Sequence, residues 1–391
     1  MKYDFDKIIE RKGSFSVKWD MPPAPYPKDS LPLWVADMDF QCAKPIVDAL
    51  HKRVDELIYG YTYYDSTELK NTVTGWYKKR YEWDVPAEDI FFSPGVVPAV
   101  ALLINILSEE GDGIVIQRPV YYPFTFKIEH NNRKVVNNPL IYKDGKYTMD
   151  YEDLERKLSA PENKGLVLCS PHNPVGRLWT EEELKKVIDI AKKYNKWIIS
   201  DEIHADLIRK GLKFIPLSKI AGDYKDQIIT CTAPSKTFNL AGFHMSNLVI
   251  HSEEYKKAYL DILNNKLSVG GVNPLGVSAM IAAYTEGEEW LDQVIDYIDA
   301  NVDYCMDFFK KELPKSVPIY IEATYLFWVD LSAYCKDPKA LEEKMAKAKV
   351  ALDEGYIFGE EGIGFERINV ACPRSILADC LNRMKDVLLE G

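Results

Sequence analysis

A lysine follows a buried apolar stretch of this sequence, and its position suggests a nucleophilic amine. Residues 228–232 (IITCT) have the β-branched composition of a buried strand, and Pro234 prevents that strand from continuing. Lys236 comes two residues later, where a chain that leaves a buried sheet reaches a crevice. Low-dielectric surroundings disfavour a charged ammonium, so a lysine there gains the neutral amine that a nucleophile requires. On this residue alone, a surface lysine in a turn remains an alternative.

Two further apolar stretches also end at residues that can do chemistry. Asp201 directly follows KWIIS, and Asn173 follows GLVLCS in a turn shaped by two prolines and a glycine. A carboxylate at the mouth of a buried sheet is costly unless a cation meets it. Taken singly, Asp201 could be a helix cap and Asn173 a turn former, and only their joint occurrence indicates a binding site.

Two more strand ends suggest places for an aromatic ring and an anion. Tyr121 and Tyr122 follow GIVIQ, and unless they are ordinary core aromatics they offer a flat face for stacking. The strand that contains FFS turns at Pro94 and Gly95, and we expect a helix to begin at about Val96. Free N–H groups and the helix dipole at that start would favour a phosphate. An amine, a carboxylate, an amide, a stacking face and an anion cradle together suit pyridoxal 5'-phosphate.

Composition and charge restrict the class of protein. The 391 residues are 47% hydrophobic and 28% charged, as in a globular protein, and the length favours two domains. The net charge of −11 argues against a nucleic-acid partner. The longest apolar run, residues 96–107, is interrupted and too short to span a membrane. Seven dispersed cysteines without a CxxC pair indicate reduced thiols and a cytoplasmic protein, and the scattered histidines indicate no metal site.

The elements that must position these residues alternate along the chain. Short apolar stretches alternate with amphipathic ones, such as the helix expected after Thr180, where Glu183 completes a capping box. Such alternation predicts a mostly parallel sheet covered by helices, in which ligands bind beyond the carboxyl ends of the strands. We expect an N-terminal arm that forms part of a small domain (residues 1–45), a large domain (46–283) and a smaller α+β domain (284–391). A nicotinamide dehydrogenase is disfavoured because no GxGxxG follows any strand.

Longer phrases carry a family resemblance over almost the whole chain. They include LPLWVADMDF, YGYTYY, SPGVVPAV, RPVYYPF, CSPHNPVGRLW, SDEIHADL, TAPSKTFNLAG and DEGYIFGEEGIGFERINVACP. In these phrases the sequence resembles the fold-type I pyridoxal-phosphate enzymes of the class I/II aminotransferase superfamily, and more closely the MalY/PatB/cystalysin-like C–S lyases (cystathionine β-lyases). The resemblance implies an α/β fold, with a seven-stranded, mostly parallel sheet between helices in the large domain and a smaller α+β domain.

The resemblance also implies roles for the residues around the cofactor ring. Lys236 resembles the Schiff-base lysine that later moves a proton, and Asp201 resembles the partner of the pyridinium nitrogen. Asn173 is similar to the amide that donates to the ring hydroxylate, and His204 falls near that same oxygen. Tyr121 resembles the ring-stacking residue.

The remaining roles concern the phosphate, the substrate and a second subunit. Tyr61 resembles a tyrosine that reaches the phosphate of the neighbouring subunit, which implies a homodimer with shared active sites. Arg367 resembles the arginine that grips the substrate α-carboxylate, a bidentate task that suits a guanidinium group. Tyr122 lies beside the stacking tyrosine, and either of the two could help a sulfur leaving group depart. The positions that match phosphate contacts are Val96, Val97 and Ser235.

Two departures from the superfamily pattern affect the expected substrate. His244 stands where many aminotransferases carry a phosphate-binding arginine, so the phosphate must depend on backbone and hydroxyl donors or on a charged histidine. The stretch LSVGGVNP lacks the arginine that binds the distal carboxylate of a dicarboxylate substrate, although Lys266 lies close by. Aspartate and glutamate are therefore disfavoured as main substrates.

The family phrases favour β-elimination from L-cystathionine or an S-substituted L-cysteine, which gives a thiol, pyruvate and ammonia. Two alternatives remain open. One is an aminotransferase of a neutral or aromatic amino acid, because the shared motifs serve both reactions. The other is a regulatory protein that binds the cofactor but acts through a protein partner.

Overall fold

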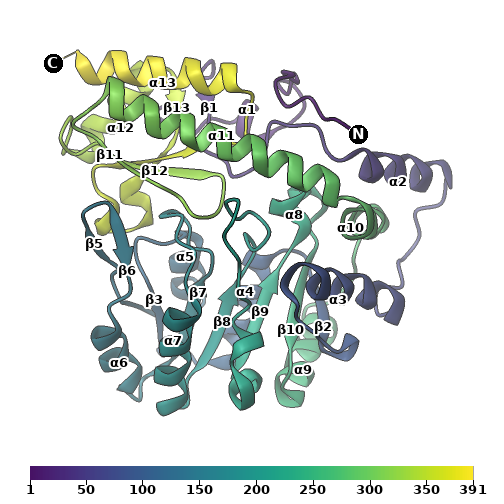
Figure 1. Ribbon diagram of the computed structural model, residues 1–391. Coiled ribbons are helices and arrows are strands. Elements are labelled where there is room, and N and C mark those ends of the chain that lie inside the picture. The colour runs from purple at the N-terminus through teal and green to yellow at the C-terminus, as the bar shows by residue number, and fades with distance from the viewer. Residues whose placement is uncertain (391) are drawn as a thin grey trace.

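A seven-stranded sheet forms the centre of the computed structural model, which describes residues 1–390 (Figure 1). Five neighbouring strands run parallel, whereas β10 runs antiparallel to both of its neighbours. In spatial order the strands are β2 (Ile90–Ser93), β10 (Ser246–Ile250), β9 (Ile228–Thr232), β8 (Trp197–Asp201), β7 (Asn163–Cys169), β3 (Gly113–Ile116) and β4 (Lys134–Asn137). The predicted α/β class with a mostly parallel seven-stranded sheet is confirmed.

Helices cover both faces of this sheet because its strands are apolar on both faces. Side chains alternate between the faces along a strand, so Ile114 and Ile116 pack with the residues of α4, α5 and α9, while Val115 packs with α6 and α7. The helices of this layer are α4 (Val96–Leu107), α5 (Pro123–Glu129), α6 (Tyr151–Ser159), α7 (Glu181–Lys193) and α9 (Glu253–Leu260). The expected capping box of Thr180 and Glu183 is present at the start of α7.

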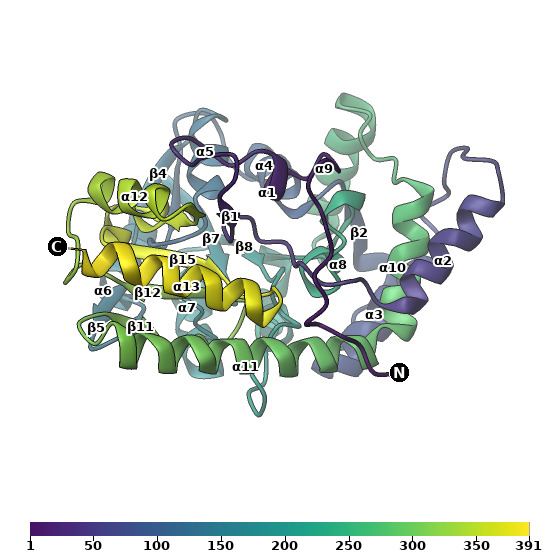
Figure 2. The ribbon, with the colours of Figure 1, turned by 90° about the horizontal axis from the view of Figure 1, so that it is seen from above.

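A smaller α+β layer lies above the sheet in Figure 1. Its four-stranded sheet has the antiparallel order β11 (Val317–Ile319), β12 (Leu326–Asp330), β15 (Phe365–Asn369) and β14 (Asp353–Glu354). Long helices pack on it, as Figure 2 shows from above: α11 (Glu288–Glu312), α12 (Pro338–Lys347) and α13 (Arg374–Leu389). The strands expected at TYLFWVDL and RINVAC are β12 and β15.

The N-terminal arm joins this smaller layer. Its strand β1 (Leu31–Pro32) pairs in parallel with β13 (Val350–Ala351), and the short helix α1 (Val17–Asp20) precedes it. Figure 2 shows the arm, drawn in purple, crossing above the ends of the central strands. The arm therefore forms a cover over the large sheet. The domain boundaries at residues 45 and 283 stay predictions.

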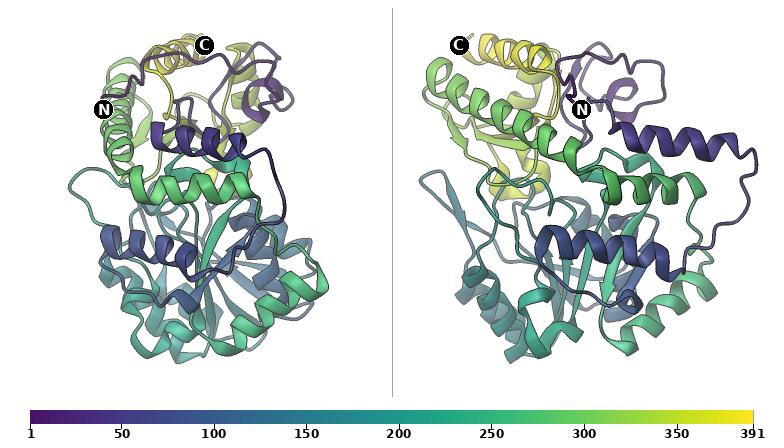
Figure 3. Two further views of the ribbon diagram at one scale, coloured as in Figure 1. Left: turned by 90° about the vertical axis from the view of Figure 1, so that its right-hand side faces the viewer. Right: turned by 45° about the vertical axis from the view of Figure 1, so that its right-hand side comes forward.

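Most of the other elements lie at the edges of the molecule, whereas the single turn of α8 (Pro234–Thr237) follows β9 at the centre. Figure 3 shows α2 and α10 side by side, and the chain between α2 and α3 runs along the outside. The elements at the edges are α2 (Lys44–Asp55), α3 (Thr67–Tyr81), α10 (Pro274–Glu286) and the hairpin of β5 (Ile141–Lys143) and β6 (Lys146–Thr148). None of the helices within residues 1–390 is long and apolar enough to cross a membrane.

Candidate active site

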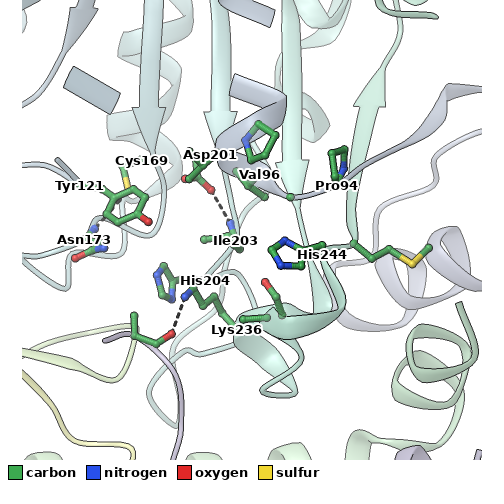
Figure 4. A pocket seen from close by; sticks show the side chains of 17 residues that line it. Pro94, Val96, Tyr121, Cys169, Asn173, Asp201, Ile203, His204, Lys236 and His244 are labelled. Atoms are coloured by element: carbon green, nitrogen blue, oxygen red, sulfur yellow. Dashed lines mark hydrogen bonds between the residues drawn. The ribbon is translucent and has the colours of Figure 1, made fainter. Parts of the chain in front are cut away.

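A cavity of about 380 Å³ opens at the carboxyl ends of β7, β8 and β9, beneath the smaller layer. Figure 4 shows the side chains that surround it. The predicted site residues that line it are Val96, Val97, Tyr121, Asn173, Asp201, His204, Ser235 and Lys236. Residues from strands that are far apart in the sequence therefore meet at one edge of the sheet, as expected for an open α/β fold.

Lys236 is carried by the single turn of α8, which begins at Pro234 directly after β9. Its Nζ donates a 2.6 Å hydrogen bond to the carbonyl oxygen of Ala36. Burial lowers the pKa of Lys236 to about 8, although the nearby carboxylate of Asp37 opposes that change. A substantial fraction of this amine is therefore neutral near pH 8 and able to act as a nucleophile or a base.

Asp201 ends β8 between two thiols. In the sheet register Cys169 of β7 lies on one side of it and Cys231 of β9 on the other, and all three side chains are buried. Its Oδ1 accepts a 3.1 Å hydrogen bond from the backbone N–H of Ile203. Burial raises the pKa of Asp201 to about 7. A cationic ring nitrogen placed against this carboxylate would stabilise its charged form.

Arg367, on β15, reaches the same region from the smaller layer. Its Nη1 donates to Oδ1 of Asn173 at 3.2 Å, and its Nη2 donates to the carbonyl oxygen of Trp34 at 2.7 Å. Nη2 also forms an ion pair with Asp353, which lies opposite it in the register of β14 and β15. The Nε of Arg367 is buried and has no hydrogen-bond partner. Arg367 does not itself line the cavity, and this buried N–H is left unsatisfied beside it.

The two neighbouring tyrosines have different surroundings. Tyr121 lines the cavity, and burial raises the pKa of its hydroxyl, which keeps the group protonated. Tyr122 does not line it, and its ring centroid lies 5.7 Å from that of Tyr121. Tyr122 packs against Phe358, on whose ring the guanidinium group of Arg367 also lies. The sequence leaves both tyrosines as candidates to assist the leaving group, whereas in the structure only Tyr121 lines the cavity.

The two histidines of the cavity also differ. His204 is buried beside Lys236 (Figure 4), and its Nδ1 has no hydrogen-bond partner. Burial, with smaller contributions from Lys236 and Arg367, lowers the pKa of His204 to about 3, so its ring is neutral. His244 lines the opposite side of the cavity and is exposed. It adopts a left-handed backbone conformation, with φ of 50°.

The start of α4 provides the anion cradle. Gly95 precedes Val96 with φ of 145°, and no side chain caps the first N–H groups of this 12-residue helix. A side chain at Gly95 would lie 3.3 Å from the ring of Pro98, so glycine suits both the conformation and the space. Ser235 lines the same cavity. The free N–H groups, the Ser235 hydroxyl and His244 are together suited to a phosphate group.

Tyr61 lies outside this cavity. Its side chain is fully exposed on the segment between α2 and α3. Within this chain it therefore contacts none of the residues that surround Lys236.

The stretch from Trp34 to Asp39 contacts the candidate site through its main chain, which the residue types did not predict. Its carbonyl oxygens accept hydrogen bonds from both Lys236 and Arg367. Asn369 holds it from the smaller layer, through bonds of 2.7 and 2.6 Å to the carbonyls of Val35 and Asp37. The phrase WVADMDF is one of those that carry the family resemblance. Its contacts with Lys236 and Arg367 are made by main-chain carbonyl oxygens, so the types of its side chains do not predict them.

Buried ion pairs fix the same segment from the arm. The carboxylate of Asp39 accepts from Arg11 at 2.6 Å, from Lys18 at 2.6 Å and from the indole of Trp19 at 2.8 Å. Arg11 also donates to Asp37 at 2.8 Å. The wall of the cavity above Lys236 is therefore held by charges that neutralise one another.

The groups around the cavity fit pyridoxal phosphate. They are an amine that is partly neutral, a buried carboxylate that forms no ion pair, an amide, the face of a tyrosine ring and a helix N-terminus. The sequence pattern of the class I and II aminotransferases matches residues 29–383. The chain therefore belongs to the aminotransferase class I and II family, whose members are pyridoxal-phosphate enzymes of fold type I.

Several relatives are similar along their full length. The chain is 42% identical to the cystathionine beta-lyase PatB of Bacillus subtilis (strain 168), over 98% of this chain and 100% of that protein. It superposes with a TM-score of 0.95 on cystalysin from Treponema denticola, which contains pyridoxal 5'-phosphate, at 42% identity over 99% of both chains. A C–S lyase from Staphylococcus hominis gives 0.94 at 36% identity, covering 100% of this chain and 99% of that one.

Proposed function

We propose that this protein is a pyridoxal-phosphate-dependent C–S β-lyase. Its substrates would be L-cystathionine or S-substituted L-cysteines, and its products a thiol, pyruvate and ammonia. The observation that carries this proposal is the full-length similarity to the cystathionine beta-lyase PatB, together with cystalysin and a C–S lyase as structural neighbours.

The residues around the cavity have the chemistry to hold the cofactor. Lys236 would bond to its aldehyde carbon, Asp201 would pair with its ring nitrogen, and Tyr121 would stack on its ring. Asn173 and the neutral His204 would face the ring hydroxyl group. The phosphate would lie against residues at the start of α4 and on the loops opposite: Val96, Val97, Ser235 and His244.

The chain's own groups account for the remaining requirements of an elimination. The α-carboxylate of the substrate would bind Arg367, whose buried Nε lacks a partner. Once the substrate amino group had replaced Lys236 at the aldehyde carbon, the freed amine of Lys236 would take the proton from Cα, because its lowered pKa leaves it partly neutral. The Cβ–S bond then breaks and the electron pair leaves with sulfur. The bound cofactor supplies an electron sink for Cα.

A hydrogen-bond donor near the sulfur would assist its departure. Tyr121 suits this role better than Tyr122, because it lines the cavity and stays protonated. Replacing Tyr121 with Phe should slow elimination about tenfold or more. An unchanged rate in that variant would remove Tyr121 from this role.

We also propose a homodimer with shared active sites. The segment between α2 and α3 exposes large apolar side chains that a monomer leaves in water, and such patches mark association surfaces. It lies against the π-helical turn Asp261–Lys266 that follows α9, where Tyr64 donates to Asn264 at 3.2 Å. The exposed residues are Leu57, Ile58, Tyr59, Tyr61, Tyr63, Leu267 and Val269. Tyr61 would then reach the phosphate of the second copy.

The cytoplasm is the proposed location. All seven cysteines are free thiols, and Cys169 and Cys231 flank Asp201 in the site. A reducing compartment keeps such thiols free.

The decisive experiment supplies L-cystathionine to the pyridoxal-phosphate-loaded protein without any keto acid and follows pyruvate and free thiol together. Equal release of both products over many turnovers would support the C–S lyase. If neither product forms, but an added keto acid starts amino-group transfer, the protein is an aminotransferase and the lyase proposal is wrong.

A further inference from the structure

A second cavity, of about 680 Å³, adjoins the first at the catalytic lysine. Lys236, Ala36 and Ala241 line both cavities. The second cavity extends from Lys236 toward the N-terminal arm, and Arg367 lines neither cavity. A molecule bound at Lys236 therefore has space beside it on the side of the arm.

Aliphatic and aromatic side chains of the arm and of the segment above Lys236 form much of this second cavity. Their shared property is that they present no hydrogen-bonding group to its interior. They are Ile9, Val17, Val35, Met38 and Phe40. Phe40 and Met38 are buried, whereas Val17 is about half exposed at the rim.

The charged side chains in the same cavity are already paired with one another. Arg11 donates through Nη2 to Asp37 at 2.8 Å and through Nη1 to Asp39 at 2.6 Å. The buried ammonium group of Lys18 occupies the other oxygen of Asp39. Apart from Lys236, no charged side chain of this lining is left without a partner, so a charged ligand group would lose hydration without gaining an ion pair. The cavity thus favours an uncharged ligand group.

We propose that this cavity is the subsite for the substituent on Cβ, and that it selects substrates whose leaving thiol is apolar. This inference rests on the proposed function, because it places Cα at Lys236 and the α-carboxylate at Arg367. With those two groups held, the substituent on Cβ extends into the remaining space next to Lys236. S-alkyl and S-aryl cysteines are then preferred over L-cystathionine, whose leaving group ends in an ammonium and a carboxylate.

Binding of non-eliminating amino acids tests the subsite apart from the reaction. The pyridoxal-phosphate-loaded protein is titrated with L-homophenylalanine, L-2-aminoadipate and L-alanine, and the absorbance of the bound cofactor gives each Kd. L-Homophenylalanine carries an apolar end, L-2-aminoadipate carries a carboxylate, and L-alanine has no extension. We expect L-homophenylalanine to bind about tenfold or more tightly than L-2-aminoadipate. Equal or tighter binding of L-2-aminoadipate would overturn the proposal.

A matched pair of variants tests the location. Val17→Asp adds a carboxylate at the rim, where the start of α1 tolerates an acidic residue. It should weaken L-homophenylalanine much more than L-alanine and reduce the preference below about threefold. Phe15→Asp is the control, because Phe15 is 98% exposed and does not line the cavity. The assignment would be contradicted if Val17→Asp left the preference for L-homophenylalanine over L-2-aminoadipate unchanged. It would also be contradicted if Phe15→Asp reduced that preference equally.

The titration with L-alanine distinguishes a failure of the subsite from a failure of the proposed function. If L-alanine perturbs the cofactor but the preference is absent, only the subsite is wrong. If no amino acid perturbs the cofactor, the proposed function fails, and the subsite fails with it.

Discussion

The amine of Lys236 donates a 2.6 Å hydrogen bond to the carbonyl oxygen of Ala36, which lies 200 residues earlier in the chain. The hydroxyl of Tyr325, from the smaller layer, donates to the same oxygen at 2.8 Å. One backbone carbonyl of the N-terminal arm therefore connects the large sheet and the smaller layer directly above the reactive amine. The arm is therefore one wall of the candidate site.

The first prediction concerns Lys236 itself. Lys236→Ala should lower the rate of elimination by at least about a thousandfold, because in the proposed function the same amine would bind the cofactor covalently and move the proton. The variant should also lose the cofactor absorbance that borohydride reduction converts to a stable product. Lys210→Ala is the control, since the Lys210 side chain is 79% exposed and pairs with Asp296 at the surface. Retained activity in Lys236→Ala would refute the assignment.

The second prediction is a pH dependence of cofactor attachment. Only the neutral amine of Lys236 attacks an aldehyde, and its pKa is lowered to about 8. The rate of attachment to cofactor-free protein, followed by stopped-flow absorbance, should therefore rise about tenfold per pH unit below 8 and level off above. Asp37 raises the pKa of Lys236, so Asp37→Asn should move the midpoint to lower pH. A midpoint that stays fixed or moves upward would argue against this electrostatic link.

The third prediction concerns the ion pairs that hold the arm. Lys18 has no exposed surface and pairs with Asp39 at 2.6 Å and with Asp37 at 3.4 Å. Asp39→Asn therefore leaves two cations, Lys18 and Arg11, with the single carboxylate of Asp37. The free energy of unfolding in urea should fall by about 3–5 kcal/mol. Asp29→Asn removes an exposed pair with Lys349 and should change it by less than about 1 kcal/mol. Similar losses of unfolding free energy in both variants would show that the buried ion pairs stabilise the fold no more than an exposed pair does.

A pair of buried carboxyl groups gives the fourth prediction. Glu354 and Glu366 lie opposite each other in the register of β14 and β15, and neither oxygen of Glu366 has a hydrogen-bond partner. Burial raises the pKa of Glu354 to about 7 and that of Glu366 well above its usual value. The folded protein therefore holds protons that the unfolded chain releases near pH 4.5, so stability falls as the pH rises through the folded pKa values.

Glu366→Gln should make that decline smaller. One carboxyl group whose pKa rises from 4.5 to about 7 accounts for about 3 kcal/mol. Between pH 5.5 and 8 the variant should keep about 1–3 kcal/mol that the unmodified protein loses. Urea unfolding at the two pH values measures the difference, with the exposed Glu360→Gln as the control. If the free energy of unfolding falls equally between these pH values in the unmodified protein and in both variants, Glu366 does not contribute to the decline and the prediction is wrong.

The fifth prediction concerns association. Leu57 and Ile58 are 80% and 74% exposed, and they lie on the segment that carries Tyr61. Analytical ultracentrifugation should give twice the mass of one chain, and Leu57→Lys with Ile58→Lys should give monomers that bind pyridoxal phosphate more weakly. Leu212→Lys, at an exposed site elsewhere, should leave both properties unchanged. A monomeric unmodified protein would contradict the shared site.

The sequence by itself determined the central sheet and most of the cavity. Apolar stretches that stop at Lys236, Asp201 and Asn173 predict strand ends, and parallel strand ends meet at one edge for geometric reasons. The capping box of α7 and the start of α4 are local features, and both appear where the residue types place them. Patterns within about ten residues were sufficient for these elements.

Only the tertiary structure decided how the arm and the smaller layer complete the site. The carbonyl oxygens of Trp34 and Ala36 do not depend on side-chain type, so no residue pattern reveals their bonds to Arg367 and Lys236. The antiparallel direction of β10 is equally invisible, because a buried strand has the same composition in either direction. Contacts that cross 200 residues depend on how the layers pack, which local periodicity does not encode.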